Sequence, residues 1–396
     1  MKRFLLIAGL LLLFAAEILR VYFIMPFPGS QKANTIDIAY FIGRNIWWLR
    51  GAAILLIIYP AVSIFTKGSK WSKAWLGITL LGYCIVAYML NFSMEADKMF
   101  RQPGTLLFAD AKGNKIPEDK LVLGVVINNT AKAYPIQLIG YHHQVVDTFG
   151  NVRVIVTYCT VCRTGRVYSP YIRELEKFDT FRLVGMDHFN AMFEDATTKS
   201  WWQQATGTAV AGPLKGQQLN ELPSQQVTLA AWLRQYPGSA IMQPDTAYKE
   251  KFEKMASYDK GRSKSDLTKR DSSSWNPKSW VVGIQHLEWA RAYDWNRLVK
   301  ERMIQDSFSL YPVLITLEKD TASFHTFSRF VDGQSLSFVK ADTSGTLKDV
   351  NTGSLWNEDG KSIAGPLTGK QLAPVAAYQE FWHSWQTFHP KTTKYK

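Results

Sequence analysis

Two cysteines separated by two residues are the clearest chemical feature of this sequence. Cys159 and Cys162 follow an apolar, β-branched run from Val152 to Tyr158, which predicts a strand that leads into a tight turn. A Cys-x-x-Cys pair can alternate between dithiol and disulfide, or it can present two thiolates to a metal. Arg163 and Arg166 stand beside the pair and would favour the thiolate form if their side chains turn toward the sulfur atoms.

Three hypotheses for the pair stay open, and we prefer the first. In the first, one thiolate attacks the disulfide of an unknown protein or small-molecule redox partner and the other resolves the mixed disulfide, with no cofactor. In the second, Cys159 and Cys162 bind copper or zinc together with His188. In the third, they are a structural disulfide or a buried thiol pair in a membrane-tethered binding module. Haem attachment is excluded, because Arg163 stands where that motif requires histidine.

The composition indicates a folded protein with a large core and an excess of positive charge. Of the 396 residues 46% are hydrophobic, and 46 Lys and Arg against 33 Asp and Glu give a net charge of +13. Such an excess can indicate nucleic acid or an anionic membrane surface as the partner. The basic residues gather at the membrane-flanking segments, in Lys249 to Lys278 and at the C-terminal tail, without a nucleic-acid-binding motif. We therefore expect the lipid bilayer as a partner, and no nucleic acid.

Three apolar runs predict that residues 1–97 form a membrane anchor of three transmembrane helices. The runs are Phe4 to Ala16, Gly51 to Thr66 and Ala74 to Met94. The first lacks a clear cleavage site, so we interpret it as an uncleaved span and not as a signal peptide. The second reaches membrane length when Ile46 to Leu49 are added, and Arg50 must then snorkel or face protein.

Basic residues predict how this anchor is oriented. They occur at the N-terminus and in the short loop between the second and third runs: Lys2, Arg3, Lys67, Lys70 and Lys73. Because such loops stay in the cytoplasm, everything after about Glu95 should lie on the other side of the cytoplasmic (inner) membrane. In that extracytoplasmic or periplasmic compartment a disulfide can persist.

The remainder of the chain repeats itself at an offset of 159 residues. The matches keep one order and are mainly apolar, Gly or Pro residues, as expected of a duplicated fold. They include Val122 to Val125 with Val281 to Ile284, Ala131 to Tyr134 with Ala290 to Tyr293, and Val154 to Thr157 with Val313 to Thr316. We predict a first repeat within residues 98–248, a charged linker or exposed loop at 249–280, and a second, diverged repeat within 281–396.

The repeat also separates candidate site residues from framework residues. Cys159 aligns with Glu318 and Cys162 with Thr321, so the second repeat lacks both thiols. His188 and Asn190 align roughly with Asp342 and Ser344, which makes them candidates for a site unique to the first repeat. The predicted site residues are therefore Cys159, Cys162, Arg163, His188 and Asn190.

Alternating and β-branched runs bounded by Gly, Asn and Asp predict a mainly β fold with a few helices. In the first repeat the expected strands are Val122 to Ile127, Ala131 to Ile136, Val152 to Tyr158, Arg166 to Tyr171 and Phe178 to Val184. One helix should close each repeat, at Thr228 to Gln235 and at Val375 to Phe388. A thioredoxin fold is not expected, because the residues after Cys162 predict another strand and not a helix.

The motifs of the two copies resemble a known family. L-G-V, A-K-A-Y-P, V-V-D-T, V-T-Y-C-x-x-C, N-A-x-x-x-D, S-x-W-x-Q-x-x-G-x-A and G-P-L-x-G-x-x-L together look like the prokaryotic domain of unknown function family 3179. The likeness covers Lys120 to about Ile241 and, in diverged form, Val281 to Trp385. It implies a β-rich domain with a Cys-x-x-Cys site, and selenoprotein members of the family favour redox use of that site. This sequence departs from the family in Thr160-Val161, where Pro-Leu is more usual, and in Arg163.

Overall fold

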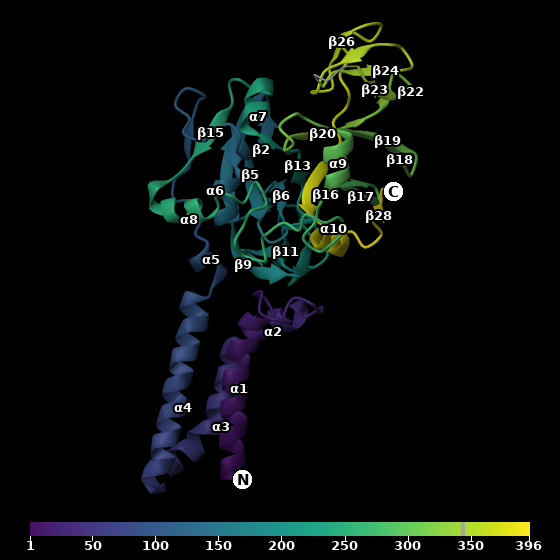
Figure 1. The fold of residues 1–396 in the computed structure, drawn as a ribbon. Helices are drawn as coiled ribbons and strands as arrows, with labels where there is room; N and C mark the ends of the chain where they lie inside the picture. Colours follow the sequence, from purple (N-terminus) through teal and green to yellow (C-terminus); the bar gives the residue numbers. More distant parts are fainter. Residues whose placement is uncertain (342–344) are drawn as a thin grey trace. The chain divides into compact units, whose positions relative to one another are not determined.

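The computed structural model describes residues 1–341 and 345–396, which fall into two compact units (Figure 1). The first unit is Met1–Gln102 together with Pro170–Leu219, and the second is Pro103–Ser169 together with Asn220–Lys396. Part of the segment that the sequence assigns to the first repeat therefore groups with the N-terminal helices. Asp342 and Ser344, the expected counterparts of His188 and Asn190, lie outside the described residues.

Three long helices form the N-terminal part of the first unit, at the purple and blue end of the chain in Figure 1. They are α1 (Lys2–Tyr22), α3 (Ile46–Lys67) and α4 (Lys70–Tyr88), the last continued by a π-helical turn at Met89–Ser93. Each is long and apolar enough to cross a membrane, which confirms the three expected apolar helices. A short helix, α5 (Ala96–Met99), follows them.

Buried polar contacts hold these three helices together. Arg50 Nε on α3 donates to Glu17 Oε1 on α1 at 2.6 Å, and Asn91 Nδ2 donates to the other Glu17 oxygen at 2.9 Å. The Glu17 side chain is fully buried. Arg50 therefore faces protein, where a carboxylate compensates its charge among apolar helices.

A four-stranded sheet completes the first unit. Its order is β12-β11-β10-β9, with β9 at Phe181–Asp187, β10 at Asn190–Asp195, β11 at Trp201–Gln203 and β12 at Ala209–Ala211. Val184, Met192 and Trp201 of this sheet pack against Ile36 and Ala39 of helix α2 (Ile36–Arg44). A small hairpin precedes the sheet, with β7 at Tyr171–Ile172 and β8 at Lys177–Phe178.

The first half of the second unit contains two sheets, of order β1-β15-β3-β2-β14 and β13-β6-β5-β4. Helix α6 (Ile136–His142) connects β3 to β4, and α7 (Leu229–Gln235) follows β14. The strand expected at Arg166 to Tyr171 is interrupted after Tyr168. The strands are β1 Leu107–Ala109, β2 Leu121–Ile127, β3 Thr130–Pro135, β4 Gln144–Phe149, β5 Val152–Cys159, β6 Thr164–Tyr168, β13 Glu221–Leu222, β14 Gln225–Thr228 and β15 Ala240–Gln243.

The second half of this unit has a sheet of order β27-β16-β17-β28 and a sheet of order β18-β19-β20. A smaller sheet, β23-β24-β25-β26, and the hairpin β21-β22 complete its described part. Its helices are α9 (Trp295–Glu301) and α10 (Trp382–Phe388). The strands are β16 Trp280–His286, β17 Trp289–Asp294, β18 Met303–Phe308, β19 Tyr311–Leu317, β20 Phe324–Ser328, β21 Phe330–Val331, β22 Gln334–Ser335, β23 Phe338–Lys340, β24 Leu347–Asp349, β25 Leu355–Trp356, β26 Ser362–Ala364, β27 Ala377–Phe381 and β28 Thr393–Lys394.

Strand pairing follows the same pattern in both halves of the second unit. β14 pairs antiparallel with β2, β2 pairs antiparallel with β3, and β3 pairs parallel with β15. β27, β16, β17 and β28 pair in the same three ways. A side-chain contact recurs too, because Tyr134 Oη donates to Asp147 at 2.6 Å and Tyr293 Oη donates to Asp306 at 2.9 Å.

The helix predicted at Val375 to Phe388 is wrong in its first part. Ala377–Phe381 is strand β27, and only Trp382–Phe388 is helical. Backbone pairing of β27 with β16 decides the conformation here, because tertiary pairing overrides the helix propensity of the two alanines before Tyr378.

The charged segment 249–280 is not an exposed loop throughout. It opens with helix α8 (Lys249–Lys254), and Tyr258 is only 2% exposed. Tyr258 Oη donates to the Thr160 carbonyl at 2.9 Å, and Lys278 Nζ donates to the Val161 carbonyl at 2.7 Å. The segment therefore covers the turn that carries the two cysteines.

A glycine in each half leaves room for the tryptophan of the closing helix. A Cβ at Gly124 would lie 2.2 Å from the Trp232 ring, and a Cβ at Gly283 would lie 2.2 Å from the Trp385 ring. Both tryptophans are almost fully buried. Close approach of β2 to α7 and of β16 to α10 therefore requires glycine.

Gly124→Ala should lower the stability of the protein by about 1–3 kcal/mol, the usual range for overpacking a core. The matched control is Gly104→Ala, because a Cβ at Gly104 meets nothing within 4 Å. Thermal unfolding of the detergent-solubilised chain measures both variants. Equal melting temperatures for the two would contradict this packing.

Candidate functional site

The two cysteines lie at the turn between β5 and β6. β5 ends at Cys159, which pairs with Thr164 at the start of β6. Arg163 closes the turn in the left-handed region, with a φ of 58°. Neither Cys159 nor Cys162 is in a disulfide, and both are 0% exposed. The turn therefore holds the pair close together and away from solvent.

Later parts of the second unit cover this turn. The Phe381 N–H at the end of β27 donates to the Cys162 carbonyl at 3.0 Å. Ser384 Oγ on α10 lies 3.4 Å from Thr164 Oγ1. Tyr258 of segment 249–280 also contacts the turn. Residues of both halves therefore surround the two cysteines.

Burial controls the protonation of the pair. It raises the pKa of the Cys162 thiol well above its ordinary value, the hydrogen bond with Cys159 acts in the same direction, and Ser384 and Lys278 oppose both. Burial also lowers the pKa of Lys278 to about 8, although the two cysteines act to raise it. The site thus combines a thiol that resists ionisation with an amine that loses its proton readily in mildly basic solution.

Arg166 is compensated by a carboxylate from the second half. Its guanidinium is 1% exposed, Nη2 donates to Glu380 Oε1 at 2.6 Å, and Nε lies 3.4 Å from Glu221 Oε1. The Tyr378 ring lies against its face, with 3.3 Å from the guanidinium carbon to the ring centroid. Although burial acts to lower the pKa of Arg166, Glu380 raises it above the ordinary value. Arg166 therefore joins β6 to β27 as a permanent cation.

Arg163 also contacts groups of the second half and of segment 249–280. Its Nε donates to Gln379 Oε1 at 2.9 Å, and its guanidinium carbon lies 3.9 Å from the centroid of the Trp280 ring. The cation that lowers the pKa of Cys162 is Lys278. The expectation that the neighbouring arginines favour the thiolate form stays a prediction, and Lys278 is a further cation that acts on Cys162.

His188 and Asn190 belong to the first unit, so the structure does not assign them to the cysteine site. His188 lies between β9 and β10, where a hydrogen bond with Asp187, at 2.6 Å from Nδ1, raises its pKa. Asn190 is fully buried, and it donates to Gln204 Oε1 at 3.0 Å and accepts from the Ala205 N–H at 2.8 Å. These contacts fit roles in the hairpin and the sheet of that unit.

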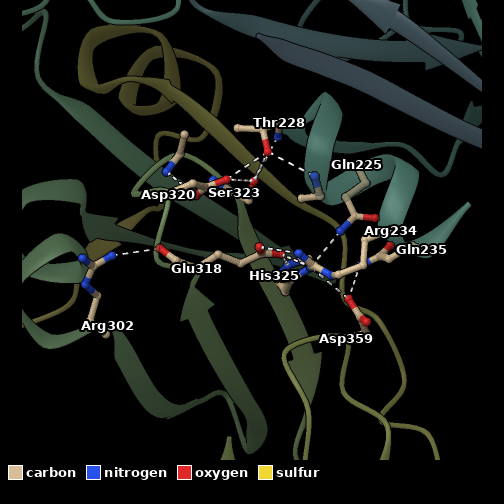
Figure 2. A network of polar contacts seen from close by, with 12 residues as sticks. Gln225, Thr228, Arg234, Gln235, Arg302, Glu318, Asp320, Ser323, His325 and Asp359 are labelled. Atoms are coloured by element: carbon tan, nitrogen blue, oxygen red, sulfur yellow. Dashed lines mark hydrogen bonds and ion pairs between the residues drawn. The ribbon is translucent and has the colours of Figure 1, made fainter. Parts of the chain in front are cut away.

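Figure 2 shows a second polar cluster, which joins residues of both halves of the second unit. Glu318, His325 and Asp359 offer ligand atoms within 4.8 Å of one another, as a metal site requires. Arg234 of α7, however, donates to both Glu318 oxygens, at 2.6 and 3.0 Å, and lies 3.5 Å from Asp359. Because Arg234 contacts both carboxylates and His325 contacts Glu318, the three possible ligands form an ion-pair network in this structure.

This network occupies the place that the cysteine turn has in the first half. Glu318 follows β19 as Cys159 ends β5, and His325 stands at the position of Arg166. Gln225 Nε2 on β14 lies 2.8 Å from His325 Nδ1 (Figure 2). β14 and α7 of the first half therefore cover the turn of the second half, as β27 and α10 cover the turn with the cysteines.

Sequence reasoning missed the residues of the second half that complete the cysteine site. They are Gln379, Glu380 and Ser384, together with Lys278 of segment 249–280. One signal was present: after the matching Gly-Pro-Leu motifs the offset is 153, which aligns Glu380 with Val227. A carboxylate at a strand position that is apolar in the other copy indicates a buried cation opposite it.

Glu380→Gln should destabilise the protein by about 3 kcal/mol, because it leaves Arg166 buried without its closest carboxylate. Glu221, at 3.4 Å, compensates part of the loss. Asp332→Asn is the control, since the Asp332 pair with Lys370 is about half exposed on both sides and such pairs contribute less than about 1 kcal/mol. Thermal or urea unfolding measures the difference, and an equal effect of the two substitutions would contradict the importance of the buried pair.

The chain was compared with known families, proteins and structures. The sequence profile of the family described as Protein of unknown function (DUF3179) matches residues 105–392, which include both cysteines and both halves of the second unit. No curated protein and no solved structure matches the chain. Since the match spans more than half of the 396 residues, this chain belongs to the DUF3179 family.

Proposed function

We propose that this protein is a membrane-anchored thiol-disulfide redox protein in which Cys159 and Cys162 are the reacting groups. The observation that carries this proposal is that both cysteines are thiols, flank one turn and share a hydrogen bond, an arrangement that suits an S–S bond. A disulfide that closes so short a loop adds little folding stability. A purely stabilising role would therefore be a poor use of the pair.

The exchange runs in two balanced steps with an external disulfide as oxidant. Lys278 in its neutral form accepts the proton of one thiol, and the resulting thiolate attacks the partner disulfide, which forms a mixed disulfide and releases one partner thiolate. The second cysteine then loses its proton and attacks the mixed disulfide, which forms the Cys159–Cys162 bond and releases the second partner thiolate. The two protons end on the two partner thiols.

Local opening of the cover must precede the first step, because neither sulfur atom is exposed. Segment 249–280 contacts the turn through the Tyr258 and Lys278 hydrogen bonds to the carbonyls of Thr160 and Val161. Two such hydrogen bonds can break in a local opening that leaves both halves folded. The pair is then a buried dithiol that reacts only after this segment has moved away from the turn.

A copper or zinc centre at the pair has less support. Such metals take three or four protein ligands from Cys, His and acidic side chains. Among the described residues, Cys159 and Cys162 belong to no group of three or more such ligands, and Lys278 places a positive charge beside them. His188, the third ligand of that hypothesis, lies in the other compact unit.

Duplication of one β-rich domain is the proposed origin of the two halves. The recurring order of strand pairing in β2, β3, β14 and β15 and in β16, β17, β27 and β28 supports it. In this proposal the second repeat has lost the thiols and serves as a scaffold that supplies Gln379 and Glu380 to the site of the first.

The proposed location of the redox site is outside the cytoplasm. Three apolar helices precede it, and Lys67, Lys70 and Lys73 lie between the second and third of them. Positive loops remain in the cytoplasm, which puts the chain after the third helix on the opposite side. That compartment would supply the oxidising environment that the exchange needs.

Alkaline phosphatase fused after Met94 should be active in cells, and a cytoplasmic reporter fused at the same residue should be inactive. The matched control is a fusion after Lys67, in the loop expected in the cytoplasm, where the two reporters should give the opposite result. An inactive phosphatase after Met94 together with an active cytoplasmic reporter there would overturn the orientation.

In a Cys84→Ser background, which removes the exposed third cysteine, oxidised glutathione should convert the pair to an intramolecular disulfide. The reaction should be slower than that of a free cysteine and should accelerate as the pH rises, because burial raises the pKa of Cys162. Quantitative maleimide labelling after acid quenching follows the loss of both thiols.

Lys278→Met should slow this oxidation several-fold at mildly basic pH, because it removes the amine that accepts the thiol proton. Lys269→Met is the matched control in the same segment, since Lys269 is exposed. Thiols that remain unreactive in the folded protein, or that react at the rate of free cysteine, would contradict a buried dithiol that reacts through local opening.

A further inference from the structure

A large cavity opens beside the cysteine turn, within the second unit. Its volume is about 840 Å³, and Arg163, the residue that follows Cys162, forms part of its wall. Asp259, Arg262, Arg270 and Trp280 from segment 249–280 and the start of β16 line the same part. A cavity of this size accommodates a small organic ligand.

Arg163 is a buried cation that forms no direct ion pair with any residue that the structure describes. Its side chain is 1% exposed. Its recorded partners are the Gln379 side chain at 2.9 Å, the Asp259 carbonyl at 3.4 Å and the faces of Tyr258 and Trp280. Buried charges are normally paired, and the Asp259 carboxylate, whose pKa the charge of Arg163 acts to lower, forms no ion pair with this guanidinium in the described part of the chain.

A second guanidinium adds to this positive charge. Arg270 lies 4.2 Å from the Trp280 ring centroid, so Trp280 contacts the guanidinium groups of both Arg163 and Arg270. Burial lowers the pKa of Arg270, and the charge of Arg163 lowers it further. Arg270 Nε and Trp280 Nε1 are buried donors without an acceptor. A negatively charged ligand that accepts hydrogen bonds would satisfy these two donors.

The cavity wall also carries six acidic residues, and two of them have a lysine or arginine partner of their own: Glu118, Asp119, Asp259, Glu318, Asp320 and Glu358. Asp119 pairs with Lys260 at 3.3 Å, and Glu318 pairs with Arg234 at 2.6 Å. Burial raises the pKa of Asp259, even though Arg163 acts to lower it. Among the described residues of this part of the wall, the guanidinium groups of Arg163, Arg262 and Arg270 stand with one carboxylate, that of Asp259.

We propose that this cavity binds a small anionic molecule through carboxylate or phosphate oxygens, with Arg163 and Arg270 as the charged contacts and Trp280 between them. Arginine suits this role because its planar fork of N–H donors matches both oxyanions. Arg262, exposed at the same wall, provides a third cation at the entrance. The binding does not depend on redox activity of the cysteines.

Isothermal titration of the full chain in detergent with citrate and with inorganic phosphate tests the proposal, at constant ionic strength set with chloride. The two probes distinguish a carboxylate from a phosphate ligand. We expect saturable binding of at least one probe, accompanied by a higher melting temperature. Arg270→Gln should weaken that binding at least about tenfold, as loss of a charge-assisted contact does.

Arg173→Gln is the matched control, because Arg173 is exposed and lies in the other compact unit. It should leave binding unchanged, and so should replacement of both Cys159 and Cys162 by serine. Arg163→Gln is the second test variant, and its folding is checked first by its melting temperature. The proposal is wrong if neither probe binds more strongly than chloride, or if Arg270→Gln binds as tightly as the Arg173→Gln control.

Discussion

Two arginines beside the cysteines are removed from water, and β27 supplies a hydrogen-bond acceptor to each but a counter-charge only to Arg166. Arg163 and Arg166 are each 1% exposed, and their closest side-chain partners, Gln379 and Glu380, are adjacent residues of β27. A buried guanidinium without partners is strongly destabilising. β27 must therefore lie against β6 whenever the first half is folded, and the two halves form one unit for this reason.

This constraint also determines the state of the thiols. Once β27 and α10 are in place, the turn is covered from that side, and segment 249–280 covers it with Tyr258 and Lys278. Desolvation then keeps the Cys162 thiol protonated, while it brings the pKa of Lys278 down to about 8. The same burial that protects the pair from chance oxidation thus places a proton acceptor next to it. In the second half an ion-pair network of Glu318, His325 and Arg234 fills the corresponding position.

The sequence predicted features that depend on local pattern. The three apolar helices, the mainly β fold and the strand ending at Cys159 follow from hydrophobic runs and β-branched residues. Contacts between distant residues could not be predicted in this way. Arg166 and Glu380 are 214 positions apart, so nothing near the cysteines indicated that Glu380 would be the partner of Arg166. β27 was taken for helix for the same reason, since its conformation depends on pairing with β16.

The central claim is that Cys159 and Cys162 are a reversible redox pair inside a closed cover. Equilibrium titration of the Cys84→Ser chain in glutathione buffers, read by mass spectrometry of the alkylated protein, tests it most directly. The account predicts one two-electron transition at a potential above about −300 mV, as for labile and catalytic disulfides. A pair that stays fully oxidised below that potential would be a structural disulfide, and a pair that never oxidises would be an inert buried dithiol. Either result would contradict the account.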